Sequence, residues 1–117
     1  MVASRKRGEN GGKRKVNQGS NWIRRTKRLA IYRRDDYRCA YCGKDLATEV
    51  ATLDHVRPVE LGGSNHESNL VTCCLSCNSS KSKLSLGKFL KVLADQGHSS
   101  EEISRRIRNS TSRKLVK

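Results

Sequence analysis

CAYC at residues 39–42 and CLSCN at residues 74–78 are the two short stretches that decide this fold. Each contains a Cys-x-x-Cys pair, which gives four cysteines in all: Cys39, Cys42, Cys74 and Cys77. Two such pairs a few tens of residues apart have the spacing of a four-thiolate zinc site, which is tetrahedral and leaves no open position for substrate. We therefore expect a structural zinc at these cysteines.

The composition is too lean for a large apolar core. Only 34% of the 117 residues are hydrophobic and 4% are aromatic, and small domains of this kind commonly need a metal or disulfides. No apolar run suits a signal peptide or a membrane span, so a reducing cytoplasm is expected, which favours zinc over the alternative of disulfides. Cys73 falls outside the paired spacing and is predicted to be a small buried residue.

Positive charge is concentrated at the two ends of the chain, whose formal net charge is +14. Residues 1–34 hold twelve Lys or Arg and one acid, residues 35–95 hold seven and eight, and residues 96–117 hold six and two. A nucleic acid is the expected partner, because each Lys or Arg placed on a phosphate releases condensed counterions. A solvated basic surface or a ribosome-like tail is the alternative.

Three parts are predicted from the changes in composition. Residues 1–19 form a basic arm predicted to be disordered, residues 20–97 form one domain with its core at about 37–84, and residues 98–117 form a basic C-terminal helix and tail. The domain is predicted to begin with an N-cap at Ser20 or Asn21.

A helix with a narrow apolar stripe follows that cap, at residues 22–34. The predicted stripe consists of Trp22, Thr26, Leu29, Ala30 and Arg33. Trp22 is interpreted as a core anchor rather than a base-stacking platform. The outward-facing cations of this helix are predicted to be Arg24, Arg25, Lys27, Arg28 and Arg34, of which the first four are our candidates for contacts with DNA.

The remaining elements predict an α+β domain. A strand at residues 50–53 runs into Asp54 and His55, a Gly-rich loop follows, and a second strand covers residues 69–73. Helices are expected at residues 78–84, at 86–93 and, after a capping box at Ser99, in the C-terminal part. Docking of the last helix is left open, because its apolar face is narrow.

Three polar residues lie where these elements meet. Asp54 and His55 end the first strand, where a bend lets both side chains reach one groove, and Asn78 follows a zinc ligand directly. Carboxylate and amide oxygens suit Mg²⁺ or Mn²⁺ better than a second zinc. A lone histidine is commonly only a structural hydrogen bonder, and His66 in the Gly-rich loop is interpreted as a surface residue.

Four motifs in combination resemble the HNH endonuclease family: LDHV-x-P at residues 53–58, Gly62-Gly63, Asn69-Leu70 and CxxCN-x-x-K at residues 74–81. The resemblance covers about residues 37–83 and implies a ββα-metal (His-Me finger) core, stapled by the four-cysteine zinc site and flanked by α-helices. Asn78 replaces the final histidine of the family's letter pattern, which points toward Mg²⁺ or Mn²⁺ as the catalytic ion.

Site roles also follow from the resemblance. It makes His55 the general base, Asn69 the residue that braces the motif loop, and Asp54 with Asn78 the ligands of the catalytic ion. Lys81 and Lys83 either bind flanking phosphates or are solvated charges. The expected products carry 5′-phosphate and 3′-hydroxyl ends. Activity should rise from about pH 6 to pH 8 and then level, the range in which an ordinary imidazole loses its proton.

The sequence thus predicts a metal-dependent endonuclease that nicks or cuts DNA with little base readout. The resemblance implies a phage, mobile-element or restriction setting in the host cytoplasm, with phage genome packaging and a terminase partner as its most specific form. A non-catalytic, zinc-stapled nucleic-acid-binding module is the alternative. A zinc-folded adaptor that docks on a larger machine through the helix at residues 86–93 is a third interpretation.

Overall fold

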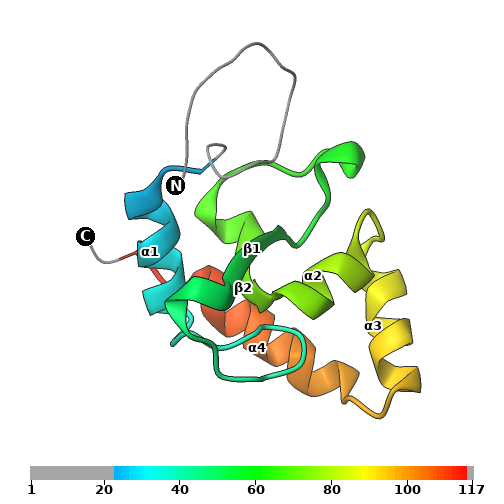
Figure 1. Cartoon of the computed structure of the whole chain (residues 1–117). Helices are drawn as coiled ribbons and strands as arrows, with labels where there is room; N and C mark the ends of the chain where they lie inside the picture. Colours follow the sequence, from blue (N-terminus) through cyan, green and yellow to red (C-terminus); the bar gives the residue numbers. More distant parts are fainter. Residues whose placement is uncertain (1–22, 116–117) are drawn as a thin grey trace.

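The computed structural model describes residues 23–115 (Figure 1). Its main elements are α1 (Arg25–Arg34), β1 (Ala51–His55), β2 (Leu70–Cys74), α2 (Leu75–Lys81), α3 (Leu86–Asp95) and α4 (Ser100–Ser112). The strands form an antiparallel hairpin in which Ala51 pairs with Cys74 and His55 pairs with Leu70. Because α2 follows β2 directly, the predicted α+β class and ββα order are confirmed. The predicted arm, the cap at Ser20 or Asn21, and Trp22 lie outside the described residues.

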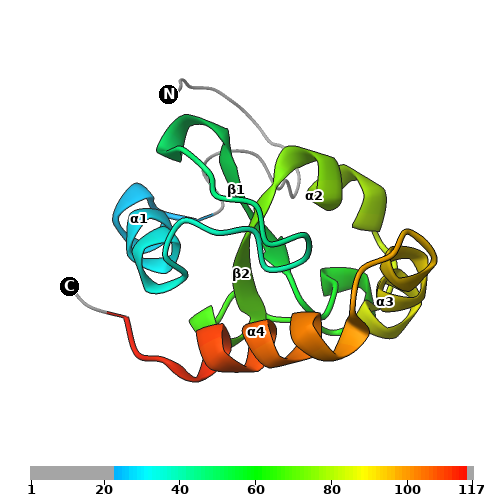
Figure 2. The ribbon, with the colours of Figure 1, turned by 90° about the horizontal axis from the view of Figure 1, so that it is seen from below.

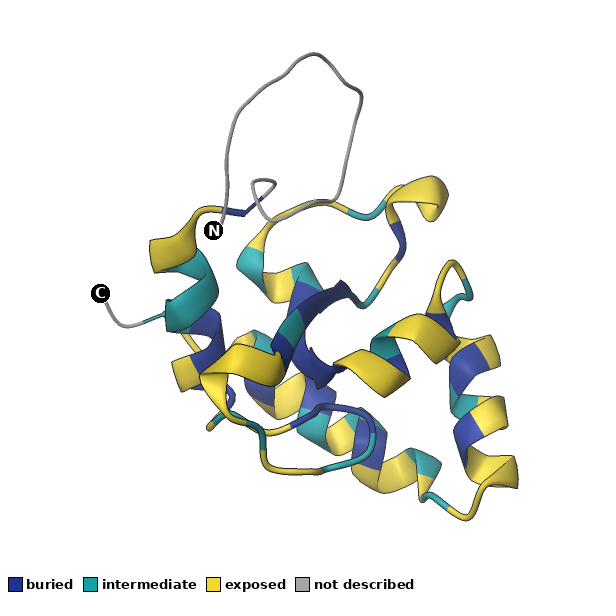
Figure 3. Ribbon diagram, in the orientation of Figure 1, coloured by how far each residue is buried: buried dark blue, intermediate teal, exposed yellow. Residues whose placement is uncertain are grey.

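Helices surround the hairpin and bury it. α1 and α4 both contact β2, α2 contacts both strands, and α3 packs on α4. Figures 1 and 2 show α1 on one flank of the hairpin and α2 with α3 on the other, while α4 runs along a third side. All five residues of β2 are buried, as are all but one of β1 (Figure 3). Two strands can therefore serve as the core of the domain, although they form a very small sheet.

The first helix differs from its prediction. It begins at Arg25, and its N-cap, Arg24, makes no side-chain capping bond. Its buried residues are Ile31, Tyr32 and Arg34, whereas Thr26 of the predicted stripe is exposed. The predicted stripe is wrong because it left Arg34 among the solvated cations. The Arg34 guanidinium is buried, since hydrogen-bond acceptors inside the protein surround it.

The helix after the second Cys-x-x-Cys pair begins three residues earlier than predicted, at Leu75. Its N-cap is Cys74, whose sulfur accepts a hydrogen bond from the backbone N–H of Cys77. The cysteine pair is therefore itself the first turn of α2. Asn78 consequently lies inside the helix, where its side chain can point back onto β1.

Helix α4 belongs to the same core. Ile103 and Ile107 are buried, and Ser99 caps the helix as predicted by accepting from the N–H of Glu102. The Arg106 guanidinium donates to the carbonyl of Ala40 at 2.9 Å. Docking of this helix, which the sequence left open, thus combines a thin apolar face with a charged hydrogen bond. Within residues 23–115 no helix combines the length and apolarity needed to cross a membrane.

Candidate metal centre and active site

Four cysteine sulfurs gather where the turn before β1 meets the start of α2. The Sγ atoms of Cys39, Cys42, Cys74 and Cys77 all lie within 4.8 Å of one another. Zinc–sulfur bonds of about 2.3 Å produce a tetrahedron of this size. In each pair the N–H of the second cysteine donates to the sulfur of the first at 3.4 Å, which supports a metal-bound thiolate. The cluster fits a four-coordinate metal, and none of the five cysteines forms a disulfide.

Cys73 is a separate case. It is fully buried, and its sulfur contacts the hydroxyl of Thr52 at 3.4 Å. Burial raises the pKa of the Cys73 thiol well above its usual range, so this thiol stays protonated. The prediction of a small buried residue is confirmed.

Asp54 is a buried carboxylate whose contacts with the described residues all end on one oxygen. Oδ2 accepts from the Tyr41 hydroxyl at 2.5 Å and pairs with Lys81 Nζ at 3.1 Å. Burial, and next the charge of Asp54, raises the pKa of Tyr41 well above its usual range, so the hydroxyl remains a donor. Oδ1 accepts no hydrogen bond from the described residues, and a hard cation could bind there.

His55 is also buried, with 6% of its surface exposed. Its Nε2 lies 2.7 Å from Oδ1 of Asn65, in the loop between the strands. Because an amide oxygen can only accept, Nε2 is the donor in this contact. The main-chain carbonyl of His55 accepts from Lys81 Nζ at 2.9 Å, so the strand end is fixed from both sides.

Asn78 reaches β1 from the second turn of α2. Its Nδ2 donates to the Thr52 hydroxyl at 3.0 Å and to the Leu53 carbonyl at 3.2 Å. Both donors are thereby used, and the amide orientation leaves Oδ1 as the atom available to a metal. Thr52 and Asp54 lie on the same face of β1, since side chains alternate along a strand. The carboxylate of Asp54 and the amide of Asn78 therefore share one side of the hairpin.

Asn69 holds the loop that joins the strands. Its Oδ1 accepts from the N–H of Arg57 at 2.9 Å, and its Nδ2 donates to the carbonyls of Arg57 and Ser64. Gly63 fits beneath these bonds only because it lacks a side chain: a Cβ would lie 1.7 Å from the Arg57 carbonyl oxygen. The packing of this loop therefore requires glycine at residue 63.

The lysines of α2 and beyond separate into two environments. Lys81, predicted to be a phosphate ligand or a solvated charge, is fully buried and paired with Asp54, so both interpretations are wrong. Lys83 lies beyond the end of α2 and is exposed. Nothing in the local sequence signals the difference, because burial of Lys81 depends on the Asp54 carboxylate, which is distant in sequence.

The predicted cations of α1 remain accessible to differing degrees. Arg24 and Arg25 are exposed, and Arg28 is partly buried. Lys27 donates to the carbonyl of Asn65 at 2.9 Å, so it also tethers the loop that contacts His55. His66, interpreted as a surface residue, is exposed and accepts from the N–H of Ser68.

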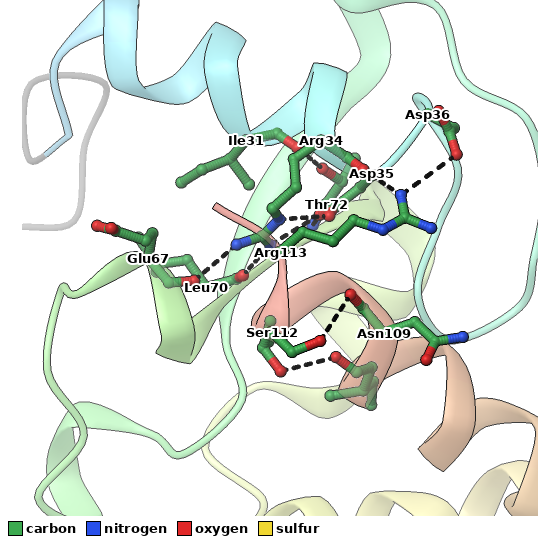
Figure 4. A network of polar contacts seen from close by, with 12 residues as sticks. Ile31, Arg34, Asp35, Asp36, Glu67, Leu70, Thr72, Asn109, Ser112 and Arg113 are labelled. Atoms are coloured by element: carbon green, nitrogen blue, oxygen red, sulfur yellow. Dashed lines mark hydrogen bonds and ion pairs between the residues drawn. The ribbon is translucent and has the colours of Figure 1, made fainter. Parts of the chain in front are cut away.

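A second buried ion pair lies at the end of α1 (Figure 4). Arg34 forms a two-pronged contact with Asp35, at 2.7 and 3.1 Å, and donates to the carbonyls of Glu67 and Leu70. Asp35 also accepts from the N–H of Thr72 at 2.9 Å. This pair joins α1 to β2 and to the end of the loop. The only signal of it in the sequence is the adjacency of Arg34 and Asp35, which is equally common among solvated residues.

Comparisons with known proteins agree with this geometry. A family model described as HNH endonuclease matches residues 39–92, which include both cysteine pairs, the hairpin, α2 and most of α3. The CRISPR-associated endonuclease Cas9 of Corynebacterium diphtheriae is 32% identical over 83 residues. That match covers 70% of this chain and 8% of the Cas9 protein, so the chain spans a small part of its relative's length.

A solved structure gives a similar result for the fold. The type II-C Cas9 enzyme from Actinomyces naeslundii superposes with a TM-score of 0.53 at 24% identity, over 83% of this chain and 14% of that one. The fold is therefore shared with a segment of a much larger enzyme. Residues 39–92, which contain the cysteine cluster and the ββα unit, match the HNH endonuclease family.

Proposed function

We propose that this chain is a metal-dependent endonuclease that hydrolyses phosphodiester bonds of DNA. One observation carries the proposal: Asp54 and Asn78 each hold an oxygen available to a cation on one side of the hairpin, and His55 ends the same strand. A protein that only bound nucleic acid would gain nothing from this arrangement, because buried polar groups are costly to maintain.

The proposed catalytic ion is Mg²⁺ or Mn²⁺, since the available oxygens of Asp54 and Asn78 are hard ligands. When bound there, a divalent ion supplies Lewis-acid stabilisation of charge on the scissile phosphate and the departing 3′ oxygen. The proposed ion at the four cysteines is zinc, which holds the start of α2 and thereby the position of Asn78.

In the proposed reaction His55 removes a proton from the attacking water as the general base. Asn65 orients the ring through Nε2, and the Lys81 contact with the main-chain carbonyl holds the residue at the end of β1. Asn69 braces the loop that carries Asn65. Exposed Arg24, Arg25 and Lys83 are proposed to bind flanking phosphates, which would make the affinity salt-dependent.

Nicking of supercoiled plasmid tests the proposal. Zinc-loaded wild-type protein should convert the plasmid to open-circle or linear form with Mg²⁺ or Mn²⁺, and His55→Ala should lower the rate at least about 100-fold. His98→Ala is the matched control, since His98 lies beyond the end of α3 and bonds through its backbone N–H to the carbonyl of Leu93. An intact plasmid with every divalent ion would instead support a zinc-stapled binding module.

The biological setting rests on the family resemblance alone. A phage or mobile-element role with a terminase partner remains a proposal, and it can be tested by co-purification with candidate partners once nuclease activity is measured. Cleavage of single-stranded and duplex DNA should be compared in the same assay, because the basic surface of α1 is suited to backbone phosphates of either form.

A further inference from the structure

We propose that Tyr41 is a positioning residue that couples the cysteine cluster to the catalytic ion by fixing the carboxylate of Asp54. The inference rests on the proposed function, because it takes Asp54 as a ligand of that ion. Tyr41 lies between Cys39 and Cys42, and its hydroxyl is 2.5 Å from Asp54 Oδ2. Tyr41 is thus part of the turn that carries Cys39 and Cys42, and its hydroxyl contacts a proposed ligand of the catalytic ion.

The ring of Tyr41 is held by packing. It is fully buried and meets the ring of Phe89 edge to face, with centroids 5.1 Å apart and an interplanar angle of 83°. The backbone just before Tyr41 is hydrogen-bonded as well. The N–H of Ala40 donates to the carbonyl of Thr72 at 2.9 Å, and Arg106 donates to the carbonyl of Ala40. The hydroxyl is therefore presented to Asp54 in a defined place.

Asp54 needs two donors on Oδ2 to hold Oδ1 toward the ion. Lys81 supplies one at 3.1 Å from α2, and Tyr41 supplies the other from the cysteine turn. With Lys81 alone, the carboxylate could rotate about the charge and present either oxygen. The Tyr41 hydroxyl removes this freedom, since it binds Oδ2 from a different element.

Coupling between the two metals follows from this geometry. A metal on the sulfurs of Cys39 and Cys42 fixes the turn that contains Tyr41, and loss of that metal would release it. The affinity of the oxygen site should therefore be lower in zinc-depleted protein. By linkage, a divalent ion bound at Asp54 should in turn slow the loss of zinc to a chelator.

Binding of Mn²⁺ to the full, zinc-loaded chain tests the inference without a nuclease assay. Partners that orient metal ligands are typically worth about 10- to 100-fold in affinity, so Tyr41→Phe should weaken Mn²⁺ binding about tenfold by titration calorimetry or by the spin signal of free Mn²⁺. Phenylalanine keeps the ring and its packing on Phe89. Zinc content is measured on the same samples and should equal that of wild type.

Tyr32→Phe is the matched control. Tyr32 is also buried, and its hydroxyl also donates to β1, at 3.1 Å from the carbonyl of Ala51. Tyr32→Phe also removes one buried hydrogen bond to β1, but it does not change the contacts of Asp54. The Mn²⁺ affinity of this variant should therefore stay within about twofold of wild type. Equal Mn²⁺ affinity in the Tyr41 and Tyr32 variants would overturn the inference.

Two further outcomes separate the inference from the proposed function. If Asp54→Ala binds Mn²⁺ as well as wild type does, the ion site itself is wrong, and the inference falls with it. If Asp54→Ala abolishes binding while Tyr41→Phe has no effect, only the inference is overturned. Loss of zinc from Tyr41→Phe would also contradict it, because the hydroxyl would then support the cysteine turn rather than Asp54.

Discussion

Two buried carboxylates, Asp35 and Asp54, show how similar parts of one small core are used for different purposes. Each is 7% exposed and each pairs with a buried cation, Arg34 or Lys81. Asp35 accepts on both oxygens, from Arg34 and from the N–H of Thr72. Among residues 23–115, Asp54 accepts only on Oδ2, from Tyr41 and Lys81. The first carboxylate is saturated and ties elements together, while the second keeps one oxygen for a ligand.

The saturated pair should be the more important for stability. Arg34→Met leaves Asp35 buried without its cation and removes the donors to Glu67 and Leu70, so it should cost about 3–5 kcal/mol of unfolding free energy. Urea unfolding of the zinc-loaded protein measures this loss. Arg33→Met is the control, because the exposed Arg33 side chain should contribute less than about 0.5 kcal/mol. A loss below about 1 kcal/mol for Arg34→Met would refute the comparison.

The half-saturated pair should respond to divalent ions. Lys81→Met should cost about 2–3 kcal/mol, somewhat less than Arg34→Met, since Asp54 keeps the Tyr41 hydroxyl. Millimolar Mn²⁺ should raise the Tm of Lys81→Met less than that of wild type, because Lys81 is one of the two donors that hold Oδ1 of Asp54 toward the ion. Thermal unfolding with and without Mn²⁺ measures the difference. Arg34→Met keeps both donors on Asp54, so it should show the full wild-type increase in Tm, and equal increases in both variants would contradict the distinction.

The loop between these two pairs should be sensitive to a single methyl group. Gly63→Ala places a Cβ against the Arg57 carbonyl and the Asn69 amide, and we expect a loss of about 2 kcal/mol. Nicking should fall by a larger factor than stability explains, because the loop also presents Asn65 to His55. Gly87→Ala is the control, since apart from its chain neighbours and its own helix backbone no described atom lies within 4 Å of the added Cβ. Equal nicking rates for Gly63→Ala and Gly87→Ala would show that the loop is not part of the proposed site.

The smallest effect is expected at the exposed edge of the Arg34–Asp35 region. Arg113 bonds the carbonyl of Arg34 at 2.9 Å and pairs with Asp36 at 3.7 Å, where the two side chains are 53% and 78% exposed (Figure 4). Arg113→Ala should therefore cost no more than about 1 kcal/mol, and the loss should shrink at high salt. Urea unfolding at two salt concentrations measures this loss of unfolding free energy. A loss as large as that of Arg34→Met would show that burial does not explain the difference between the Arg34–Asp35 and Arg113–Asp36 pairs.

Local patterns were enough for most of the fold. The two Cys-x-x-Cys pairs, the strand ending on Asp54 and His55, and the apolar repeat of α3 each depend on neighbours within a few residues, and the structure contains all of them. Two predictions failed, one because of a local cap and one because of contacts distant in sequence. Cys74 caps α2 and so starts it early, and α1 turns a different face inward than its own periodicity suggested.

Residue types and their order determined the family, the cysteine cluster and the candidate roles of Asp54, His55, Asn69 and Asn78, because these follow from chemistry at short spacing. Only the tertiary structure decided which charges are buried. Lys81 and Arg34 resemble surface cations until folding brings them to Asp54 and to the carbonyls of Glu67 and Leu70. A charge is buried only when its partners surround it, and those partners come from segments that are far apart in the chain.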